Sequence, residues 1–384
     1  MNTTRQKFTI DGSDALENHL AAVCKRVVDG LRRELPGSML EAIVLAGGYG
    51  RGQGGVLQTP GGNRPYNDLE FYVFLRGTPW LNGRRYNSAL QGFGERLSPD
   101  AGVHVEFKID SLAALRRRPI SMFSYDLLAQ HRELWAVGET FRGCEHHLEP
   151  TTLPSVEATR LLLNRCTGLL LARSILAENS ALTPDQADFI GRNLAKLRLA
   201  LGDAVLTAFG HYHWNCLFRH ERLRIIEPPE SPPDLERIRE QHAQGVEFKL
   251  HPCRQTDSHT AFSDKVQELS VLAFQLWVWL ESRRLGRAFA TPRDYALSRL
   301  EKCRETSRWI NCFLNLRTFG PKALLNTDLN RYPRERLFNT LPLLLWCQPG
   351  EPEISRRVQQ QLMTKASDFT GWLSAYKQLW PDYG

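Results

Sequence analysis

Hydrophobic and polar positions along the first part of the chain predict alternating helices and strands. Apolar residues recur at helical spacing over 16–31, whereas the continuous apolar run 43–46 is typical of a buried strand. Two further segments, 69–75 and 103–110, alternate apolar and polar side chains, as half-buried strands do. We also expect helices around 87–97 and from Ser111 and Ser121. This mixture predicts a small α/β unit built on a mixed sheet.

The pattern changes at the proline-containing stretch 149–154, and beyond it the periodicity is almost wholly helical. The predicted helices cover 156–176, 184–209, 263–284, 293–316 and 355–379. We therefore expect an α+β protein with two domains. A small mixed-sheet domain covers 1–150, and a mostly α-helical bundle domain covers 151–384, interrupted by a proline-rich loop at 226–235.

The composition predicts a cytoplasmic protein. With 384 residues and 42% hydrophobic content, the chain can bury large cores. Apolar helical runs such as 269–280 are too short to span a bilayer, so we expect no membrane partner. Residues 1–11 are polar and lack the apolar segment of a signal peptide. The eight cysteines show no paired C-x-x-C spacing, which favours reduced thiols.

The formal net charge of +7 is modest for this length. It is compatible with a polyanionic partner, but a single anion-binding site also calls for some excess of arginine and lysine. The basic runs 116–118 and 302–308 carry no interleaved aromatic stripe and no recognised RNA-binding motif. We therefore interpret them as solvated helix surface.

Two carboxylates stand one residue apart at the strand over 69–75. Asp68 and Glu70 project from one face of this strand, while apolar side chains occupy the other. Adjacent acids repel unless a cation lies between them, and Mg²⁺ or Mn²⁺ favours carboxylate oxygens. A lone pair of this kind is also common at an exposed strand edge. If 103–110 lies alongside, however, Glu106 can supply a third carboxylate, whereas Asp110 can cap the following helix.

A glycine-rich turn over 47–55 follows the buried strand. Gly47 and Gly48 can adopt backbone angles closed to other residues and let N–H groups approach a phosphate. Arg51 adds a guanidinium suited to phosphate oxygens. The turn is not a Walker A loop and lacks the full dinucleotide-binding spacing, and its later glycines are equally consistent with a flexible loop.

Together, these motifs resemble the polymerase-β-type nucleotidyltransferase superfamily. The motifs that carry the resemblance are Gly47-Gly48-Tyr49-Gly50-Arg51-Gly52, Asp68-Leu69-Glu70 and Val105-Glu106-Phe107. Members transfer a nucleoside monophosphate from a nucleoside triphosphate to a hydroxyl or similar acceptor and release pyrophosphate. The resemblance covers roughly 39–110 and implies that the first domain is a nucleotidyltransferase domain.

Carried over residue by residue, the resemblance makes Gly47 and Gly48 triphosphate-binding. It makes Asp68, Glu70 and Glu106 the catalytic residues and the ligands of Mg²⁺ or Mn²⁺. Family habit favours ATP as donor, so AMP would be the group transferred. The acceptor stays open among a small molecule, a protein and RNA, and the oligomeric state stays open as well.

Two departures from the family pattern keep other functions open. Nineteen residues separate Gly48 from Asp68, with 57–65 resembling an inserted loop, and Glu70 stands where Asp is commoner. The first alternative is a catalytically degenerate domain that binds a nucleoside triphosphate as a sensor, scaffold or toxin–antitoxin-type partner. The second is an enzyme that adds nucleotides to a tRNA or other RNA 3′ end.

Charged residues within the helical part are further candidates for the site. Arg165 interrupts the apolar run 161–171, and burying an arginine without a partner is costly. Lys196 and Asp203 stand seven residues apart, two helical turns along one face. Arg165 and Lys196 are predicted to bind the nucleotide phosphates, with Asp203 either orienting them or acting on the acceptor. The alternative is an internal salt-bridge set joining two helices.

Overall fold

The computed structural model describes residues 6–348 and 350–384. Residues 1–5, which begin the stretch considered for a signal peptide, and residue 349 lie outside the described residues. The chain divides into two compact units. Unit 1 comprises 1–154, 209–226 and 243–254, and unit 2 comprises 155–208, 227–242 and 255–384. The first break lies beside the boundary at 150 taken from the sequence, but unit 1 also takes two later segments.

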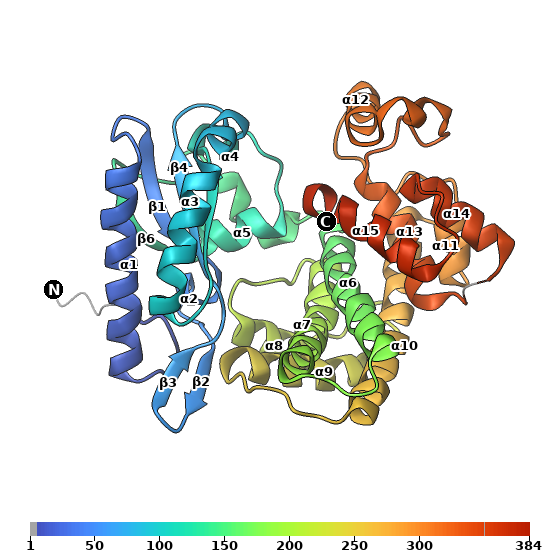
Figure 1. The fold of residues 1–384 in the computed structure, drawn as a ribbon. Helices are drawn as coiled ribbons and strands as arrows, with labels where there is room; N and C mark the ends of the chain where they lie inside the picture. Colours follow the sequence, from blue (N-terminus) through green and yellow to red (C-terminus); the bar gives the residue numbers. More distant parts are fainter. Residues whose placement is uncertain (1–5, 349) are drawn as a thin grey trace. The chain divides into compact units, whose positions relative to one another are not determined.

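Unit 1 contains a four-stranded mixed sheet in the order β5-β4-β1-β6. Figure 1 labels β1, β4 and β6 of this sheet. The strands are β1 (Leu40–Leu45), β4 (Leu69–Leu75), β5 (Val105–Asp110) and β6 (Arg132–Ala136). β1 pairs antiparallel with β4 and β6, whereas β4 and β5 are parallel. The expectation of a mixed sheet within an α+β protein is therefore confirmed.

The helices of unit 1 come from three parts of the chain. They are α1 (Asp14–Glu34), α2 (Gly47–Gly50), α3 (Pro79–Ala101), α4 (Leu112–Leu115), α5 (Met122–Ala129), the 3₁₀ turns η1 (Glu145–His147) and η2 (Pro150–Thr152), α8 (Cys216–Ile225) and the end of α9 (Leu235–Leu250). The segment before α8 packs on α5 through Tyr125 and Tyr212, whose ring centroids lie 5.9 Å apart. This aromatic contact helps to attach 209–226 to unit 1.

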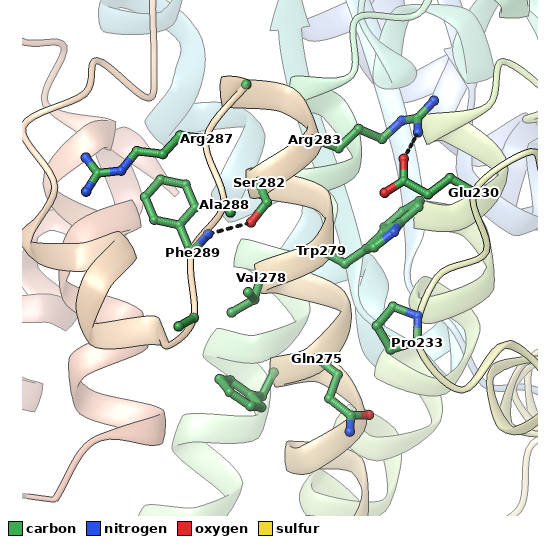
Figure 2. Close-up of a pocket in the computed structure, with 13 residues that line it drawn as sticks. Glu230, Pro233, Gln275, Val278, Trp279, Ser282, Arg283, Arg287, Ala288 and Phe289 are labelled. Atoms are coloured by element: carbon green, nitrogen blue, oxygen red, sulfur yellow. Dashed lines mark hydrogen bonds and ion pairs between the residues drawn. The ribbon is translucent and has the colours of Figure 1, made fainter.

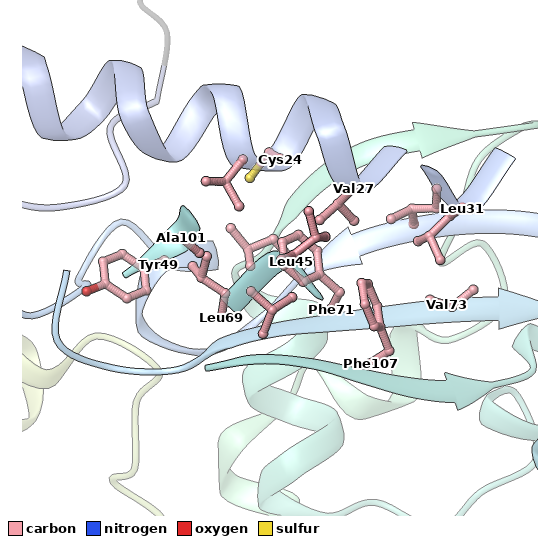
Figure 3. Close-up of a cluster of buried hydrophobic side chains, with 14 of the residues drawn as sticks. Cys24, Val27, Leu31, Leu45, Tyr49, Leu69, Phe71, Val73, Ala101 and Phe107 are labelled. Atoms are coloured by element: carbon pink, nitrogen blue, oxygen red, sulfur yellow. The ribbon is translucent and has the colours of Figure 1, made fainter. Parts of the chain in front are cut away.

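Alternation along the strands buries both faces of the sheet. Ile43 and Leu45 of β1 join one apolar cluster with residues of α1 and α3, which Figure 3 shows. Ala42 and Val44 join a second cluster with residues of α4 and α5. Because both faces are covered, β1 reads as a continuous apolar run instead of an alternating one.

Two features of unit 1 differ from the sequence-based expectation. The stretch predicted as an inserted loop forms a hairpin of β2 (Val56–Thr59) and β3 (Gly62–Pro65). Its strands pair through backbone groups, which a glycine- and proline-rich composition does not reveal. β6 was not predicted, because four of its residues are only partly buried, Glu133 is exposed, and the segment carries no clear alternation.

The described residues of unit 2 form helices and the loops that connect them, without a strand. Its helices are α6 (Val156–Glu178), α7 (Pro184–Ala208), the first half of α9, α10 (His259–Leu285), α11 (Pro292–Leu297), α12 (Arg308–Phe319), the 3₁₀ segment η3 (Gly320–Leu325), α13 (Arg334–Trp346), α14 (Pro352–Leu362) and α15 (Phe369–Tyr383). The expected helical C-terminal region is confirmed. The proline-rich loop lies between α8 and α9, as predicted.

Two of the predicted helices are broken. The helix expected over 293–316 stops at Leu297 and resumes at Arg308, and the one expected over 355–379 stops at Leu362. Met363 ends α14 in the left-handed conformation, with φ 53°. These breaks are set by capping and turning of the backbone, which leave the apolar spacing nearly unchanged. Among the described residues, no helix is long and apolar enough to cross a membrane.

Helix α3 lies against β5 through a glycine, and this contact is directly testable. A Cβ at Gly94 would lie 2.3 Å from the backbone oxygen of Val105, whereas a Cβ at Gly83 on the same helix meets nothing within 4 Å. We expect Gly94→Ala to lower the free energy of unfolding by about 2 kcal/mol. Gly83→Ala should raise it by about 0.5–1 kcal/mol through helix propensity.

Chemical denaturation of both variants beside the wild type measures the two effects. The Gly83 variant is the matched control, because helix, residue type and substitution are the same. Equal changes in the two variants would contradict a close approach of α3 to β5.

Candidate active site

The parallel pairing of β4 with β5 brings two of the predicted acids side by side. Glu70 stands opposite Glu106 in the strand register. Both carboxylates are partly exposed, on the face opposite the Phe71 and Phe107 side chains, which pack with α1 and α3. Asp68 is exposed and lies immediately before β4. The sheet therefore joins Glu70 and Glu106, with Asp68 two residues from Glu70.

A lysine on β5 lies between these two carboxylates. Lys108 Nζ is 3.3 Å from Glu106 Oε2 and 3.8 Å from Glu70 Oε2. Its ammonium group also lies 5.7 Å from the centre of the Tyr72 ring. From the sequence, a metal ion was expected to offset the repulsion between these carboxylates. In the structure the ammonium group of Lys108 offsets it. Across the part of the chain that the structure describes, no group of three His, Cys, Asp or Glu side chains is arranged to hold a metal ion.

The other acid on β5 has a structural role. Asp110 is buried and receives two hydrogen bonds of 2.9 Å from the guanidinium group of Arg118. It also accepts a hydrogen bond from the backbone N–H of Ser111, which precedes α4. The hydrogen bonds of Asp110 thus stabilise the start of α4. Glu106 is therefore the carboxylate of β5 that can act together with Glu70.

The glycine turn after β1 lies beside Glu70 of this acidic pair. Gly47 has a φ of 64°, and a Cβ there would lie 3.5 Å from the carboxyl carbon of Glu70. The backbone N–H groups of Gly47, Gly48 and Tyr49 make no backbone hydrogen bond within the described residues. A turn with unused N–H groups therefore lies directly beside Glu70, whose carboxylate is a side chain of the kind that binds metal ions.

Tyr49 fixes the shape of the glycine turn from within. Its buried hydroxyl donates to Gly55 O and accepts from Tyr66 N, both at 2.8 Å. Burial raises the pKa of Tyr49 to about 12, so the hydroxyl stays protonated. A Cβ on Gly54 would lie only 1.9 Å from the Tyr49 ring, and glycine is therefore needed there.

Beside the turn, Arg51 begins a cluster of charged side chains drawn from four parts of unit 1. Its Nη1 lies 3.2 Å from Asp126 Oδ2 on α5, and the Tyr212 hydroxyl donates to both Asp126 oxygens at 3.2 Å. Arg219 on α8 donates to the backbone oxygens of His213 and Trp214. Arg51 Nε is buried without a hydrogen-bond acceptor among the described residues. One carboxylate is thus shared within a group that carries excess positive charge.

Lys249, near the end of α9, completes this basic cluster. The pKa of Lys249 is lowered to about 8, chiefly by loss of hydration. Arg51 and Arg219 contribute to this lowering, while Cys216 and Asp126 oppose it. Within the described residues, its ammonium group has neither a hydrogen bond nor an ion pair. Lys249 and Arg51 both have hydrogen-bond donors without an acceptor in a partly desolvated environment. Such an environment is suited to binding an anion.

The remaining predicted residues lie in unit 2. Arg165 on α6 is half-buried and donates to Asn164 Oδ1 at 2.9 Å, and Lys196 on α7 is exposed. Asp203 is buried and lies 3.1 Å from His242 Nε2. Asp203 therefore joins a buried contact between α7 and α9. Nucleotide binding by Arg165 and Lys196 stays a prediction.

Unit 2 also contains a pocket of about 620 Å³ between α10 and the segments that flank it (Figure 2). Phe274, Trp279 and Phe289 are among its lining residues. The carboxylate in the lining, Glu230, forms an ion pair with Arg283 at 2.6 Å. This lining is suited to an apolar ligand, and it offers no carboxylate pair for a metal ion.

No protein-family model, no curated protein and no solved structure matches this chain. The functional interpretation therefore rests on the geometry of the site itself.

Sequence reasoning missed the basic cluster and the role of Lys108. Asp126, Tyr212, Arg219 and Lys249 are far apart in the chain and share no spacing motif, so only folding brings them together. Lys108 was visible on the polar face of its strand, two residues after Glu106. That spacing was the one signal that could have placed it beside the acids.

The lowered pKa of Lys249 predicts a stability cost that can be measured. Its folded pKa, about 8, lies below its usual 10.5, so the unfolded chain binds more protons between these values. Stability should therefore rise with pH over that interval. Lys249→Met removes the charge and should raise the free energy of unfolding at neutral pH by on the order of 2 kcal/mol.

Denaturant unfolding between pH 7 and about pH 11, above the ordinary lysine pKa, measures this difference. Lys25→Met, at an exposed position of α1, is the matched control and should change stability little. If the free energy of unfolding depends on pH in both variants as it does in the wild type, Lys249 is not desolvated.

Proposed function

We propose that unit 1 is a metal-dependent nucleotidyltransferase. It would move a nucleoside monophosphate, AMP where ATP is the donor, to an acceptor and release pyrophosphate. The observation that carries this proposal is the register of β4 and β5, which pairs Glu70 with Glu106 while Gly47 contacts Glu70. An acidic pair beside a turn with unused N–H groups suits a metal-bound triphosphate.

The donor set fits Mg²⁺ or Mn²⁺. Glu70 and Glu106 offer hard oxygen ligands in register, Asp68 adds a third at the start of β4, and partial exposure leaves room for water ligands. The position of Lys108 shows that the pair already attracts a cation. A bound divalent ion would polarise the α-phosphate and stabilise the charge that develops during transfer.

The basic cluster supports the phosphate end of the same site. Arg51 follows the glycine turn, and its partly exposed guanidinium group together with the Lys249 ammonium can hydrogen-bond phosphate oxygens. The acceptor oxygen attacks the α-phosphorus, and the bond from that phosphorus to the oxygen bridging to the β-phosphate breaks. Glu106 takes the acceptor proton as general base, and the electron pair of the broken bond leaves with pyrophosphate.

Label transfer from each α-³²P nucleoside triphosphate tests this proposal. Small-molecule, protein and RNA fractions of a cell extract serve as acceptors, with Mg²⁺ or Mn²⁺ present. Glu70→Gln should lower transfer at least about a hundredfold, because it removes one negative ligand from the metal while preserving the side-chain shape. The labelled fraction names the acceptor class.

Glu95→Gln, an exposed position on α3, is the matched control and should transfer at the wild-type rate. Transfer at the wild-type rate in Glu70→Gln would contradict the assignment of Glu70 as a metal ligand of the active site. Label confined to RNA, with binding that weakens steeply as salt rises, would select the RNA 3′-end reaction.

Lys108 supports a second candidate, a domain that binds a nucleoside triphosphate without turnover. Its ammonium group lies where the two glutamates would share a metal, at 3.3 Å and 3.8 Å from their oxygens. A permanent side-chain cation can hold the acids together and leave the site without a catalytic ion. Tight triphosphate binding with no label transfer to any fraction would establish this alternative.

Lys108→Met distinguishes the two candidates. If Lys108 competes with a catalytic ion, the variant should need about tenfold less Mg²⁺ for half-maximal transfer, because one competing charge near the pair is lost. Titration of Mg²⁺ at saturating triphosphate measures this shift. An unchanged requirement in an active enzyme would show that Lys108 does not stand in the place of the metal.

A further inference from the structure

A group of large apolar side chains on α12 and η3 is exposed. Trp309 is 86% exposed, Phe313 64% and Leu325 91%, and Ile310 and Leu324 are also mostly or half exposed. We call these five residues the α12 face. Side chains exposed to this degree project from the surface, whereas residues that line a groove are shielded by its walls. Five large apolar side chains exposed between positions 309 and 325 mark an interaction site.

The opposite side of α12 is polar and buried, which is the reverse of an ordinary surface helix. Asn311 Nδ2 donates to Asn330 O at 3.1 Å, and Asn315 Nδ2 donates to Leu329 O and Arg331 O at 3.0 Å and 2.8 Å. Arg336 Nε on α13 donates to Asn315 Oδ1 at 3.0 Å. These bonds fix the rotation of α12 about its axis, so the apolar face is held outward.

The charge around the α12 face is mainly positive. Residues 306–327 contain no Asp or Glu and include three basic residues, Arg308, Arg317 and Lys322. All three are exposed, and none forms an ion pair within the described residues. One exposed acid, Asp382, lines a groove together with Arg317 and Lys322. The surroundings of the face are thus cationic.

We propose that the α12 face rests on an anionic lipid surface. Projecting Trp, Phe and Leu side chains enter the boundary between headgroups and acyl chains, while neighbouring Arg and Lys contact acidic headgroups. A second copy of this chain fits poorly, because two identical faces would bring six unpaired cations together. The helix has 12 residues and lies along the surface without crossing it.

This proposal is independent of the nucleotidyltransferase proposal and differs from the expectation of no membrane partner. That expectation rested on apolar runs too short to span a bilayer. The length needed to span a bilayer does not limit a helix that lies along the membrane surface.

Co-sedimentation of the full chain with vesicles tests the proposal. Vesicles of phosphatidylcholine alone are compared with vesicles that also contain phosphatidylserine, at low and high salt. We expect binding to be about tenfold to a hundredfold tighter with phosphatidylserine and to weaken as salt rises. Trp309→Ser/Phe313→Ser should weaken binding at least about tenfold, because two apolar side chains no longer enter the bilayer.

Ile225→Ser is the matched control, since Ile225 on α8 is 79% exposed and lies outside the α12 face. It should bind vesicles as the wild type does, and circular dichroism checks that every variant is folded. Failure of the wild type to bind anionic vesicles, or equal binding by Trp309→Ser/Phe313→Ser, would overturn the proposal. Self-association in solution that is lost in that double variant, without vesicle binding, would instead make the face an interface between copies.

Discussion

The in-register parallel pairing of β4 with β5 is the constraint on which the candidate site depends. It places Glu70 opposite Glu106, and a slip of one residue would turn one acid to the other face of the sheet. Packing on the buried face opposes such a slip. The rings of Phe71 and Phe107 lie 5.6 Å apart, and α3 approaches β5 closely at Gly94. The core on one face therefore fixes the chemistry on the other.

Unit 1 separates its charges on either side of the glycine turn. The acids on β4 and β5 share the positive charge of Lys108, whereas Arg51 and Lys249 share the negative charge of Asp126. Each group keeps a net charge, negative around Lys108 and positive around Asp126, so each has capacity for a ligand of opposite charge. A triphosphate with its metal ion carries both signs, and this arrangement could bind the two ends without burying an unpaired charge.

Around α12 and α13, unit 2 buries polar side chains beside its apolar core. Lys302 is buried and donates to Ser298 O at 3.0 Å and to Asn339 Oδ1 at 2.5 Å. The pKa of Lys302 is lowered to about 7, because the effect of burial exceeds the opposing effect of the Glu335 carboxylate. Hydrogen bonds of this kind are directional, so they fix the orientation of α12 and α13 more narrowly than apolar packing would. The outward α12 face follows from that orientation.

By itself the sequence determined the elements with strong local periodicity, namely α1, β1, β4, β5, α6, α7 and α10. It also determined which acids and glycines share the ends and faces of those strands, because alternation is a property of the extended chain. Only the tertiary structure decided the β2–β3 hairpin, the breaks after Leu297 and Leu362, and the place of Lys108 between two glutamates. It alone gathered Arg51, Asp126, Tyr212 and Lys249. Strand pairing, helix termination and charge clustering depend on contacts between distant residues and on loss of hydration, and local spacing encodes neither.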